Sequence, residues 1–370
     1  MVMNSAPVKL GIIGCGNVTR KRHLPAIQSL SDLQLVALAD IDVSRLDQAG
    51  DRYGIQRRYS DYHDLLQDQD IEAVAVCAPL ELHVEMALAA LDAGKHVLIE
   101  KPLAPSLDQA DELIERAEGS PCKVMVGYNL RWHRLVRQAR EMIRQGKLGQ
   151  TELAVAVFTA GTHYKNDVLE WKKRRALGGG VLMEFATHYF DLWRFLLQTE
   201  VEEVFAATRS NGWDDVTGTL SASLSDGALA TVYFSEWTSE RNEVHIYGQA
   251  GSLHLSLYRF DGLEFVPLFT APGQIGHRLS RAANSIRHIP RALAHFRSGG
   301  EYYASFIEEW RHFARAIRDD VPVGCTLHDG RCALQIALAA TKSASTGQPV
   351  SVKAAPSRIV PLPEDVRDDH

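Results

Sequence analysis

The sequence VKLGIIGCGNVT, residues 8–19, decides the fold of this chain. Its first part, Lys9 to Ile13, is a short apolar run with β-branched residues, which is typical of a buried parallel strand. Gly14 and Gly16 follow at once and predict a tight turn. An apolar helix face comes next, formed by Leu24, Ala26, Ile27 and Leu30. This order predicts a cradle for phosphate, because glycines let backbone N–H groups approach an anion and the helix N-terminus adds partial positive charge.

The glycine motif is incomplete, because Thr19 stands where the G-x-G-x-x-G fingerprint has its third glycine. The next predicted strand, Gln34 to Ala39, ends in Asp40, 24 residues after Gly16. A carboxylate at this place binds the ribose hydroxyls of an adenosine and repels a 2′-phosphate. The pattern therefore predicts NAD in preference to NADP. The alternative is that Asp40 only ends a strand as a turn residue.

Composition limits the classes of protein that this chain can be. With 370 residues, 45% of them hydrophobic, it is long enough for two ordinary domains. The net charge of −6 gives no indication of binding to nucleic acid or to an anionic membrane surface. Residues 1–7 lack the basic and apolar regions of a signal peptide, and no apolar run reaches the ~18 residues of a membrane span. We therefore expect a cytoplasmic protein.

The five cysteines are scattered along the chain, and none forms a C-x-x-C pair. An odd number without such pairs supports neither a disulfide framework nor a zinc site. We expect reduced thiols and no bound metal.

Strands and helices alternate through the first third of the chain. After Asp40 the pattern predicts helices near 43–53, 62–67, 81–93 and 106–118, and strands at 73–78, 96–99 and 123–127. Continuous apolar strands that alternate with helices are typical of a doubly wound parallel sheet. We predict a nucleotide-binding domain of this class over residues 1–127, with its ligand at the carboxyl ends of the strands.

The pattern changes after residue 127. Beyond a helix near 132–145, strand-like stretches recur at 152–158, 201–210, 218–224, 228–234, 243–247 and 252–257. Several follow one another without helices, which predicts a large, mostly antiparallel open sheet. Two late helices, near 303–317 and 329–346, are expected to cover one face. The predicted fold class is therefore α/β, with a second α/β domain over residues 128–352 and a tail over residues 353–370.

The second informative stretch is GGGVLMEFATHYFDLWRFL, residues 178–196. On a helix, Glu184, His188 and Asp191 would project from one face, because their spacing is i, i+4 and i+7. A histidine general base with carboxylates to orient it would explain three polar groups on one stripe. The alternative is a solvated helix face with a salt bridge to Arg194 or Arg175.

Lys101 is the other candidate for chemistry. It directly follows a predicted strand, within Glu100-Lys101-Pro102, at the edge of the sheet where ligands gather. A lysine there can bind a substrate hydroxyl and stabilise the developing alkoxide. Lys101 and His188 together would suit the oxidation of a secondary alcohol. The alternative for Lys101 is an exposed lysine at a strand end.

These residues together resemble the Gfo/Idh/MocA family, the group of glucose-fructose oxidoreductase and inositol dehydrogenase. The resemblance covers about residues 8 to 352 and implies a Rossmann domain, then an α/β domain with a large open sheet. It also implies NAD(P)-dependent oxidation or reduction of a sugar or cyclitol. The motifs that carry it are Gly14-x-Gly16, Asp40, Pro79 with His83, Ala93-Gly94-Lys95-His96-Val97 before Glu100-Lys101-Pro102, Gly127-Tyr128-Asn129, and the triple glycine before Glu184 and His188.

The resemblance further implies residue roles. Lys101 and His188 would be catalytic, and Glu184 stands where the family usually has aspartate. One extra methylene moves that carboxylate by roughly an ångström, which can cost ~100-fold in rate if the group touches the substrate. Leu80 and Ala186 are further departures, which weaken statements about the substrate rather than about the family. The implied contacts of NAD are Gly14, Gly16, Asn17, Val18, Asp40, Ala78, Pro79, His83, Glu100, Lys101 and Asn129.

The expected partners are a small sugar-like substrate and further copies of the chain, as a homodimer or homotetramer formed through the open sheet. Two alternative functions stay open. A redox-neutral enzyme would retain NAD and use transient oxidation for epimerisation, elimination or glycoside cleavage. A non-enzymatic regulator would sense the cofactor, but it would be expected to lack Lys101 or His188.

Several other residues are weaker candidates. Trp132, Trp171 and Trp193 could each offer a flat face to a sugar ring or simply fill the core. Arg131 and His133 could approach the nicotinamide or the substrate. A segment without acids, residues 273–300, could bind a phosphorylated or nucleotide-linked sugar, or form a solvated loop or subunit contact. Its arginines are Arg278, Arg281, Arg287, Arg291 and Arg297.

Overall fold

The computed structural model describes residues 6–164, 168–270, 273–295 and 300–352, so the predicted tail over 353–370 lies outside the described residues. The chain divides into two compact units. Of the described residues, the first unit contains 6–129 together with Phe306–Arg331, and the second contains 130–305 together with 332–352. The boundaries predicted at residues 127 and 352 stay predictions. What the sequence did not indicate is the return of Phe306–Arg331 to the first unit.

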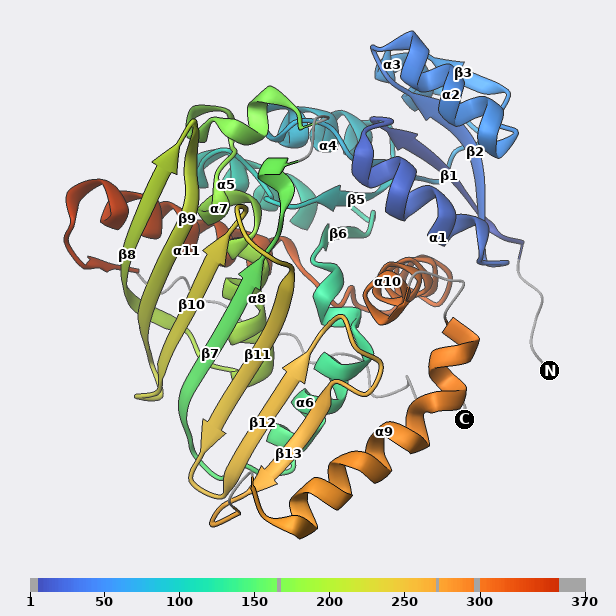
Figure 1. Cartoon of the computed structure of the whole chain (residues 1–370). Helices are drawn as coiled ribbons and strands as arrows, with labels where there is room; N and C mark the ends of the chain where they lie inside the picture. Colours follow the sequence, from blue (N-terminus) through green and yellow to red (C-terminus); the bar gives the residue numbers. More distant parts are fainter. Residues whose placement is uncertain (1–5, 165–167, 271–272, 296–299, 353–370) are drawn as a thin grey trace. The chain divides into compact units, whose positions relative to one another are not determined.

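The first unit is built on a parallel sheet of six strands (Figure 1). Its spatial order is β3-β2-β1-β4-β5-β6, which is the order of a doubly wound dinucleotide-binding fold. This confirms the predicted fold class of the N-terminal half. One strand, β3, was not located in the sequence because it is short and polar. The bounds are β1 Val8–Ile13, β2 Leu33–Ala39, β3 Arg57–Tyr59, β4 Ala73–Val76, β5 His96–Glu100 and β6 Val124–Gly127.

Helices connect these strands and begin where the sequence provides caps. Asp42 accepts a hydrogen bond from the Arg45 N–H at the start of α2, and Ser106 accepts one from the Gln109 N–H at the start of α5. These caps explain why both helices begin close to the predicted residues. The bounds are η1 Thr19–His23, α1 Leu24–Gln28, α2 Val43–Tyr53, α3 Tyr62–Gln67, η2 Leu80–Leu82, α4 His83–Asp92 and α5 Leu107–Glu118.

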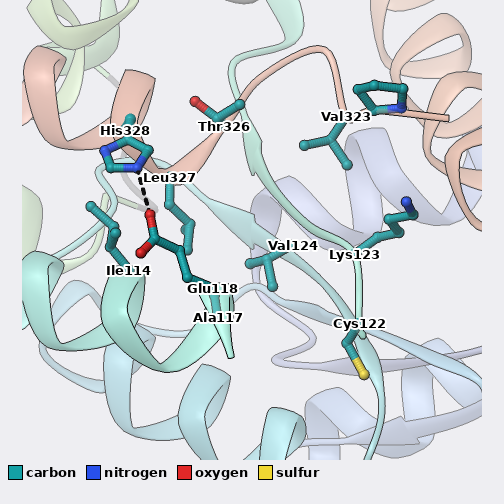
Figure 2. Close-up of a pocket in the computed structure, with 11 residues that line it drawn as sticks. Ile114, Ala117, Glu118, Cys122, Lys123, Val124, Val323, Thr326, Leu327 and His328 are labelled. Atoms are coloured by element: carbon teal, nitrogen blue, oxygen red, sulfur yellow. Dashed lines mark hydrogen bonds and ion pairs between the residues drawn. The ribbon is translucent and has the colours of Figure 1, made fainter. Parts of the chain in front are cut away.

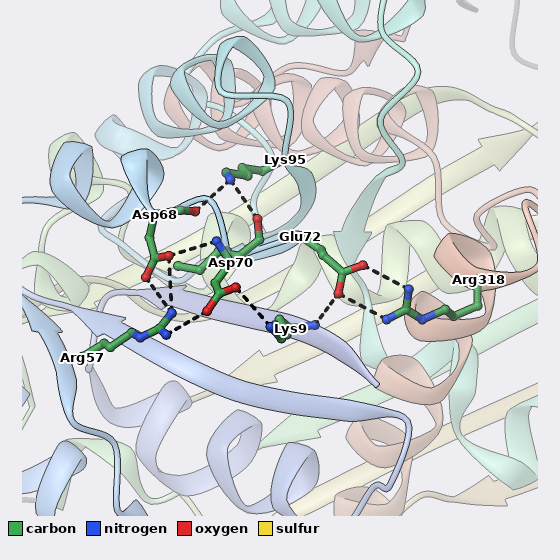
Figure 3. A network of polar contacts seen from close by, with 8 residues as sticks. Lys9, Arg57, Asp68, Asp70, Glu72, Lys95 and Arg318 are labelled. Carbon is green, nitrogen blue, oxygen red and sulfur yellow. Dashed lines mark hydrogen bonds and ion pairs between the residues drawn. The ribbon is translucent and has the colours of Figure 1, made fainter. Parts of the chain in front are cut away.

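A late part of the chain completes the first unit. From Phe306, helix α10 (Gly300–Arg318) belongs to it, and Trp310 and Phe313 on this helix are fully buried. The end of the helix is tied to the sheet through the Arg318 guanidinium, which donates to the Glu72 carboxylate at 3.0 and 3.2 Å. Figure 3 shows this pair within a larger polar network at the amino ends of the strands. The apolar contacts supply most of the stability, since half-exposed ion pairs contribute little.

The second unit is built on an eight-stranded sheet in the order β13-β12-β11-β7-β10-β9-β8-β14. All its neighbouring strands are antiparallel except β7 and β10, which confirms the prediction of a mostly antiparallel sheet. The sequence indicated six of these strands and missed the short β13 and β14. The bounds are β7 Thr151–Thr159, β8 Val201–Asn211, β9 Trp213–Leu224, β10 Leu229–Ser235, β11 Arg241–Gly248, β12 Gly251–Ser256, β13 Leu263–Pro267 and β14 Val350–Ser351.

One face of this sheet packs on helices of the same unit, whereas the other face meets the helix Ile275–His295 at Glu264, which pairs with His277 and Arg281 (Figure 1). Along the strands, buried residues alternate with exposed ones such as Phe205, Tyr233 and Tyr247. No helix in the described part of the chain is both long and apolar enough to cross a bilayer. The helices are η3 Asn129–Trp132, α6 Arg134–Arg144, η4 Thr162–Tyr164, η5 Glu170–Lys173, η6 Arg175–Leu177, α7 Val181–Glu184, α8 Ala186–Leu197, α9 Ile275–His295 and α11 Leu327–Thr346.

His133 is a fully buried cap of α6, and this place gives it a structural role. Its Nδ1 accepts a hydrogen bond from the Leu135 N–H at 3.3 Å, and its Nε2–H donates to the Leu257 carbonyl at 3.0 Å. Burial lowers the pKa of His133 from 6.5 to about 4. The ring is therefore neutral, and both of its nitrogens form hydrogen bonds within the second unit.

We expect this histidine to make stability depend on pH. Above pH 6.5 the ring is neutral in both the folded and the unfolded protein. Below pH 6.5 the unfolded chain binds a proton on His133, whereas the folded chain binds it only near pH 4. Stability should therefore fall by about 3 kcal/mol as the pH drops across this window. In His133→Asn, which keeps a capping side chain, urea unfolding at several pH values should show a smaller loss. An identical loss in both proteins would contradict this assignment.

Candidate active site

The glycine turn after β1 has the geometry that a phosphate cradle needs. Gly14 has a φ of +99°, and a β-carbon there would lie 2.3 Å from the carbonyl oxygen of Cys77, so glycine is required. At Gly16 a β-carbon would meet no atom within 4 Å. The turn is thus closed on the side of β4 and open at Gly16, beside Asn17 and Val18 at the start of the first helix. These residues fit the pyrophosphate of a dinucleotide.

Thr19, in place of the third glycine, stabilises the turn. It is fully buried, and its hydroxyl donates a hydrogen bond to the carbonyl oxygen of Gly14 at 2.6 Å. A hydroxyl that closes the turn gives a physical reason why the incomplete fingerprint still forms it. The sequence carried no signal for this bond, because the fingerprint assigns the position to glycine.

Asp40 is fixed against the same turn. Its carboxylate accepts the Cys15 N–H at 2.7 Å and the Asp42 N–H at 2.8 Å, and Arg45 lies 3.6 Å away. Both oxygens retain lone pairs, so the carboxylate can also accept ribose hydroxyls. Burial, and then the Asp40 carboxylate, raise the pKa of the Cys15 thiol to about 12. Cys15 is therefore a protonated thiol that packs in the turn rather than a nucleophile.

Replacement of Asp40 should change the cofactor preference. In Asp40→Asn the negative charge is lost while one backbone contact can be kept, and Arg45 remains beside the position. We expect the KM for NAD to rise roughly 10-fold and the ratio of NADP to NAD efficiency to rise further, since the repulsion of a 2′-phosphate is removed. Steady-state kinetics with both cofactors measure this. Asp47→Asn, an equal change of charge on α2, should leave the ratio unchanged, and an unchanged ratio in Asp40→Asn would contradict the role.

His83 joins the loops that follow β4 and β5. Its Nδ1 lies 2.8 Å from the Pro102 carbonyl oxygen, and its Nε2 lies 2.9 Å from that of Ala78. The side chain is buried, and burial lowers its pKa. A neutral ring has a single N–H, so His83 donates to one of these two carbonyl oxygens and packs between the loop at Ala78 and the loop at Pro102. A direct contact of His83 with NAD stays a prediction.

Lys101 follows β5 and is half-buried at the carboxyl end of the sheet. Its backbone N–H donates to the carboxylate of Glu100 at 3.1 Å. Asn129, at the end of the first unit, is buried just after β6. The strands thus bring Asp40, Ala78, Lys101 and Asn129 to one edge of one sheet. Their contacts with NAD and substrate stay predictions.

In the second unit, the triple glycine brings a lysine to Glu184. A β-carbon on Gly179 would lie 2.4 Å from the carbonyl oxygens of Trp171 and Lys172, so only glycine lets the chain pass this close. The Gly180 N–H also donates to the Lys172 carbonyl at 3.2 Å. Lys172 then forms an ion pair with Glu184, whose side chain is buried at the end of α7. Sequence reasoning did not name Lys172.

The predicted stripe of Glu184, His188 and Asp191 does not lie on one continuous helix. Helix α7 ends at Glu184 and α8 begins at Ala186, where His188 is half-buried. Asp191 is buried and forms a bidentate pair with Arg131, at 2.6 and 2.8 Å. This pair anchors α8 inside the second unit, so Asp191 and Arg131 have a structural role. Of the partners suggested by the sequence, Arg194 pairs with Glu200 and Arg175 with Asp215.

The weaker candidates are also placed by the structure. Trp132 and Trp193 are core residues, whereas Trp171 is half-buried beside Lys172. The basic segment is largely the helix α9 rather than a loop. It is held by Glu264, which pairs with His277 at 3.1 Å and Arg281 at 3.2 Å. Arg297 and the side chain of Arg291 lie outside the described residues.

A pocket of about 320 Å³ lies in the first unit, at the amino end of β6 (Figure 2). Apolar residues such as Ile114, Val124 and Leu327 form most of its wall, with the ion pair of His328 and Glu118 at 3.2 Å beside them. The predicted cofactor contacts follow the carboxyl ends of the strands, so this pocket is not the predicted site. In the described part of the chain, no three His, Cys, Asp or Glu side chains are grouped to hold a metal ion.

Comparison with known proteins relates both halves of the chain to one family. Residues 8–128 match the GFO/IDH/MocA family, described as an oxidoreductase family with an NAD-binding Rossmann fold. Residues 136–254 match the GFO/IDH/MocA C-terminal domain. The two matches lie in the two halves that carry the parallel sheet and the open sheet.

Individual relatives cover most of the chain. ORF334, an uncharacterised oxidoreductase of Rhizobium meliloti, is 30% identical over 250 residues, which are 67% of this chain and 74% of that protein. A myo-inositol 2-dehydrogenase of Thermotoga maritima is 26% identical over 345 residues, 91% of this chain and 96% of that protein. The structure of the WlbA dehydrogenase of Bordetella pertussis, in complex with NADH and UDP-GlcNAcA, has a TM-score of 0.78 at 21% identity and covers 95% of this chain and 99% of its own. At that identity the likeness shows a shared fold.

Proposed function

This chain belongs to the GFO/IDH/MocA oxidoreductase family, and from that membership we propose that it transfers a hydride between NAD and a secondary hydroxyl or ketone of a sugar, a cyclitol or a sugar derivative. The chain is an oxidoreductase, and its N-terminal domain is an NAD-binding Rossmann fold. The substrate class is supported by a relative named myo-inositol 2-dehydrogenase that matches nearly the whole chain.

One observation carries the proposal. Lys101 directly follows β5, at the edge where the glycine turn and Asp40 also lie, and this is where open α/β sheets bind their ligands. A lysine at this edge places a positive charge next to the region where a ligand would bind. It suits the stabilisation of an oxygen that becomes negative during oxidation.

We assign three roles to residues of this chain. NAD⁺ supplies the hydride acceptor when it is bound. His188 takes the proton of the reacting hydroxyl, and Lys101 donates a hydrogen bond to the same oxygen. Glu184, held by Lys172, orients His188 or a neighbouring hydroxyl of the substrate. The proposal requires that His188 and Lys101 act on one substrate.

A panel of substrates tests the function. The purified protein is incubated with NAD⁺ and with aldoses, inositols, sugar acids and nucleotide sugars, and the absorbance of NADH is followed. NADH should accumulate in step with product for at least one class. If a product forms without net NADH, the redox-neutral alternative is correct. If no sugar or cyclitol is changed in either direction, the proposed function is wrong.

The oligomeric state and location are also proposals. The exposed side chains on the open sheet include Phe205 at 44% and Tyr233 at 45%, which would be covered in a homodimer or homotetramer formed through this face. Light scattering of the protein, compared with a Phe205→Glu/Tyr233→Glu variant, tests this arrangement. A cytoplasmic location is retained as a prediction.

A further inference from the structure

A cluster of buried polar side chains in the first unit has no part in the roles assigned so far. It lies under the carboxyl end of β5, around Glu100, and most of it comes from residues distant in the sequence. The side chains of His23, Glu309 and Trp310 are 0% exposed, and Glu100 is 7% exposed. Cys77, buried after β4, also faces His23. Buried polar groups are costly unless they are paired, so the cluster needs a reason.

Three of these side chains form a chain of hydrogen bonds with one direction. The indole N–H of Trp310 lies 3.1 Å from Nδ1 of His23, and an indole can only donate. Nδ1 is therefore the acceptor, and Nε2 carries the proton that is donated to the Glu100 carboxylate at 2.8 Å. Cys77 and Glu100 outweigh the effect of burial and raise the pKa of His23. A proton on Nδ1 would face the indole N–H, however, so the hydrogen bond from Trp310 requires the neutral tautomer with its proton on Nε2.

This series of hydrogen bonds ends at the backbone N–H of Lys101. One oxygen of Glu100 is occupied by His23, and the other accepts the Lys101 N–H at 3.1 Å. The direction of the Glu100 carboxylate therefore fixes where the Lys101 side chain starts. Rings pack around the histidine and keep it in place, with Phe306 at 5.5 Å and Trp310 at 5.7 Å between ring centroids, both edge-on.

Glu309 completes the cluster as a neutral acid. Among the described residues neither of its carboxyl oxygens has a hydrogen-bond partner. Burial raises the pKa of Glu309 well above its ordinary value, and the nearby Glu100 carboxylate adds to the rise. A protonated Glu309 leaves Glu100 as the negative charge of the cluster next to Lys101.

We propose that Trp310, His23 and Glu100 form a positioning relay for Lys101, and that Glu309 supports it in its protonated form. The inference rests on the proposed function, because it gives Lys101 a catalytic role. The relay residues do not touch substrate. They act by fixing the Lys101 backbone, and an error of about an ångström at a reacting group can cost ~100-fold in rate.

The test removes one hydrogen-bond donor and keeps the packing. Trp310→Phe retains an aromatic ring but lacks the N–H, so His23 and Glu100 are free to turn. We expect kcat to fall roughly 10- to 100-fold while the KM for NAD and the affinity for NADH stay at wild-type values. In a Lys101→Met background the same substitution should lower the residual turnover no further, because the relay acts through Lys101.

Two controls separate the loss of the hydrogen bond from a general loss of packing. Trp193→Phe makes the same substitution at a core tryptophan of the second unit, and Glu309→Gln keeps the shape of a neutral acid, so both should retain wild-type kcat. If Trp310→Phe does not fold, His23→Leu carries the same measurement. An unchanged kcat in Trp310→Phe, an equal loss in NADH affinity, or a further loss in the Lys101→Met background would overturn the relay. Full turnover in Lys101→Met alone would instead disprove the catalytic role of Lys101, whereas an absence of turnover in the unchanged protein would disprove the proposed function.

Discussion

A His188→Ala enzyme is expected to lose roughly 10³-fold in kcat while it binds NADH as tightly as the unchanged protein. The reason is that His188 is proposed to take the hydroxyl proton as the hydride leaves, and no other half-buried histidine stands on α8. The predicted cofactor contacts belong to the first unit, so NADH binding should be unaffected. Stopped-flow or steady-state turnover, together with NADH fluorescence titration, measures both quantities.

A matched histidine separates this effect from a general loss of structure. His245 lies on β11 with its side chain partly exposed, in the same unit as His188. His245→Ala should keep wild-type turnover. If His188→Ala also kept it, or if its loss of turnover followed a loss of NADH binding, the role of His188 as the base would be wrong.

Lys101→Met should lower kcat by roughly 10²- to 10³-fold, because a positive donor at the developing alkoxide is lost. Methionine keeps most of the length of the side chain, so the packing after β5 is retained. The thermal midpoint and the affinity for NADH should therefore stay near their wild-type values. Turnover in both directions is the measurement, since the donor serves oxidation and reduction alike.

The control for this change is Lys147→Met, which removes an exposed lysine of the second unit. It should have no effect on turnover. A Lys101→Met protein that kept its turnover would show that Lys101 is only a residue at a strand end. A protein that lost NADH binding together with turnover would show that Lys101 serves the cofactor rather than the reaction.

Much of this fold is local and was therefore open to prediction. Strands β1 and β4 are continuous apolar runs, and caps such as Asp42 and Ser106 mark helix starts within a few residues. The glycine turn and Asp40 follow a known spacing, so the NAD domain could be inferred. Lys101 and His188 could be named as candidates because each lies in a short motif with a family resemblance.

Other features depend on contacts between distant residues and leave no local pattern. The ion pair of Lys172 with Glu184 exists because glycines bring two turns together, and Arg131 meets Asp191 from 60 residues away. The parallel pairing of β7 with β10 cannot be read from either strand. Helix α9 was missed because its apolar side chains, such as Ile275 and Ile286, are exposed and its polar ones make the contacts.

The return of Phe306–Arg331 to the first unit has a consequence for how the protein is made. The first 129 residues leave the ribosome long before Trp310 does. In the nascent chain, His23 and Glu100 therefore lack the hydrogen bond and the packing that the Trp310 indole provides. A gene fragment that stops after the sixth parallel strand would encode the same unfinished state permanently. Anyone who transplants this nucleotide-binding half into another enzyme should graft the distant helical segment with it.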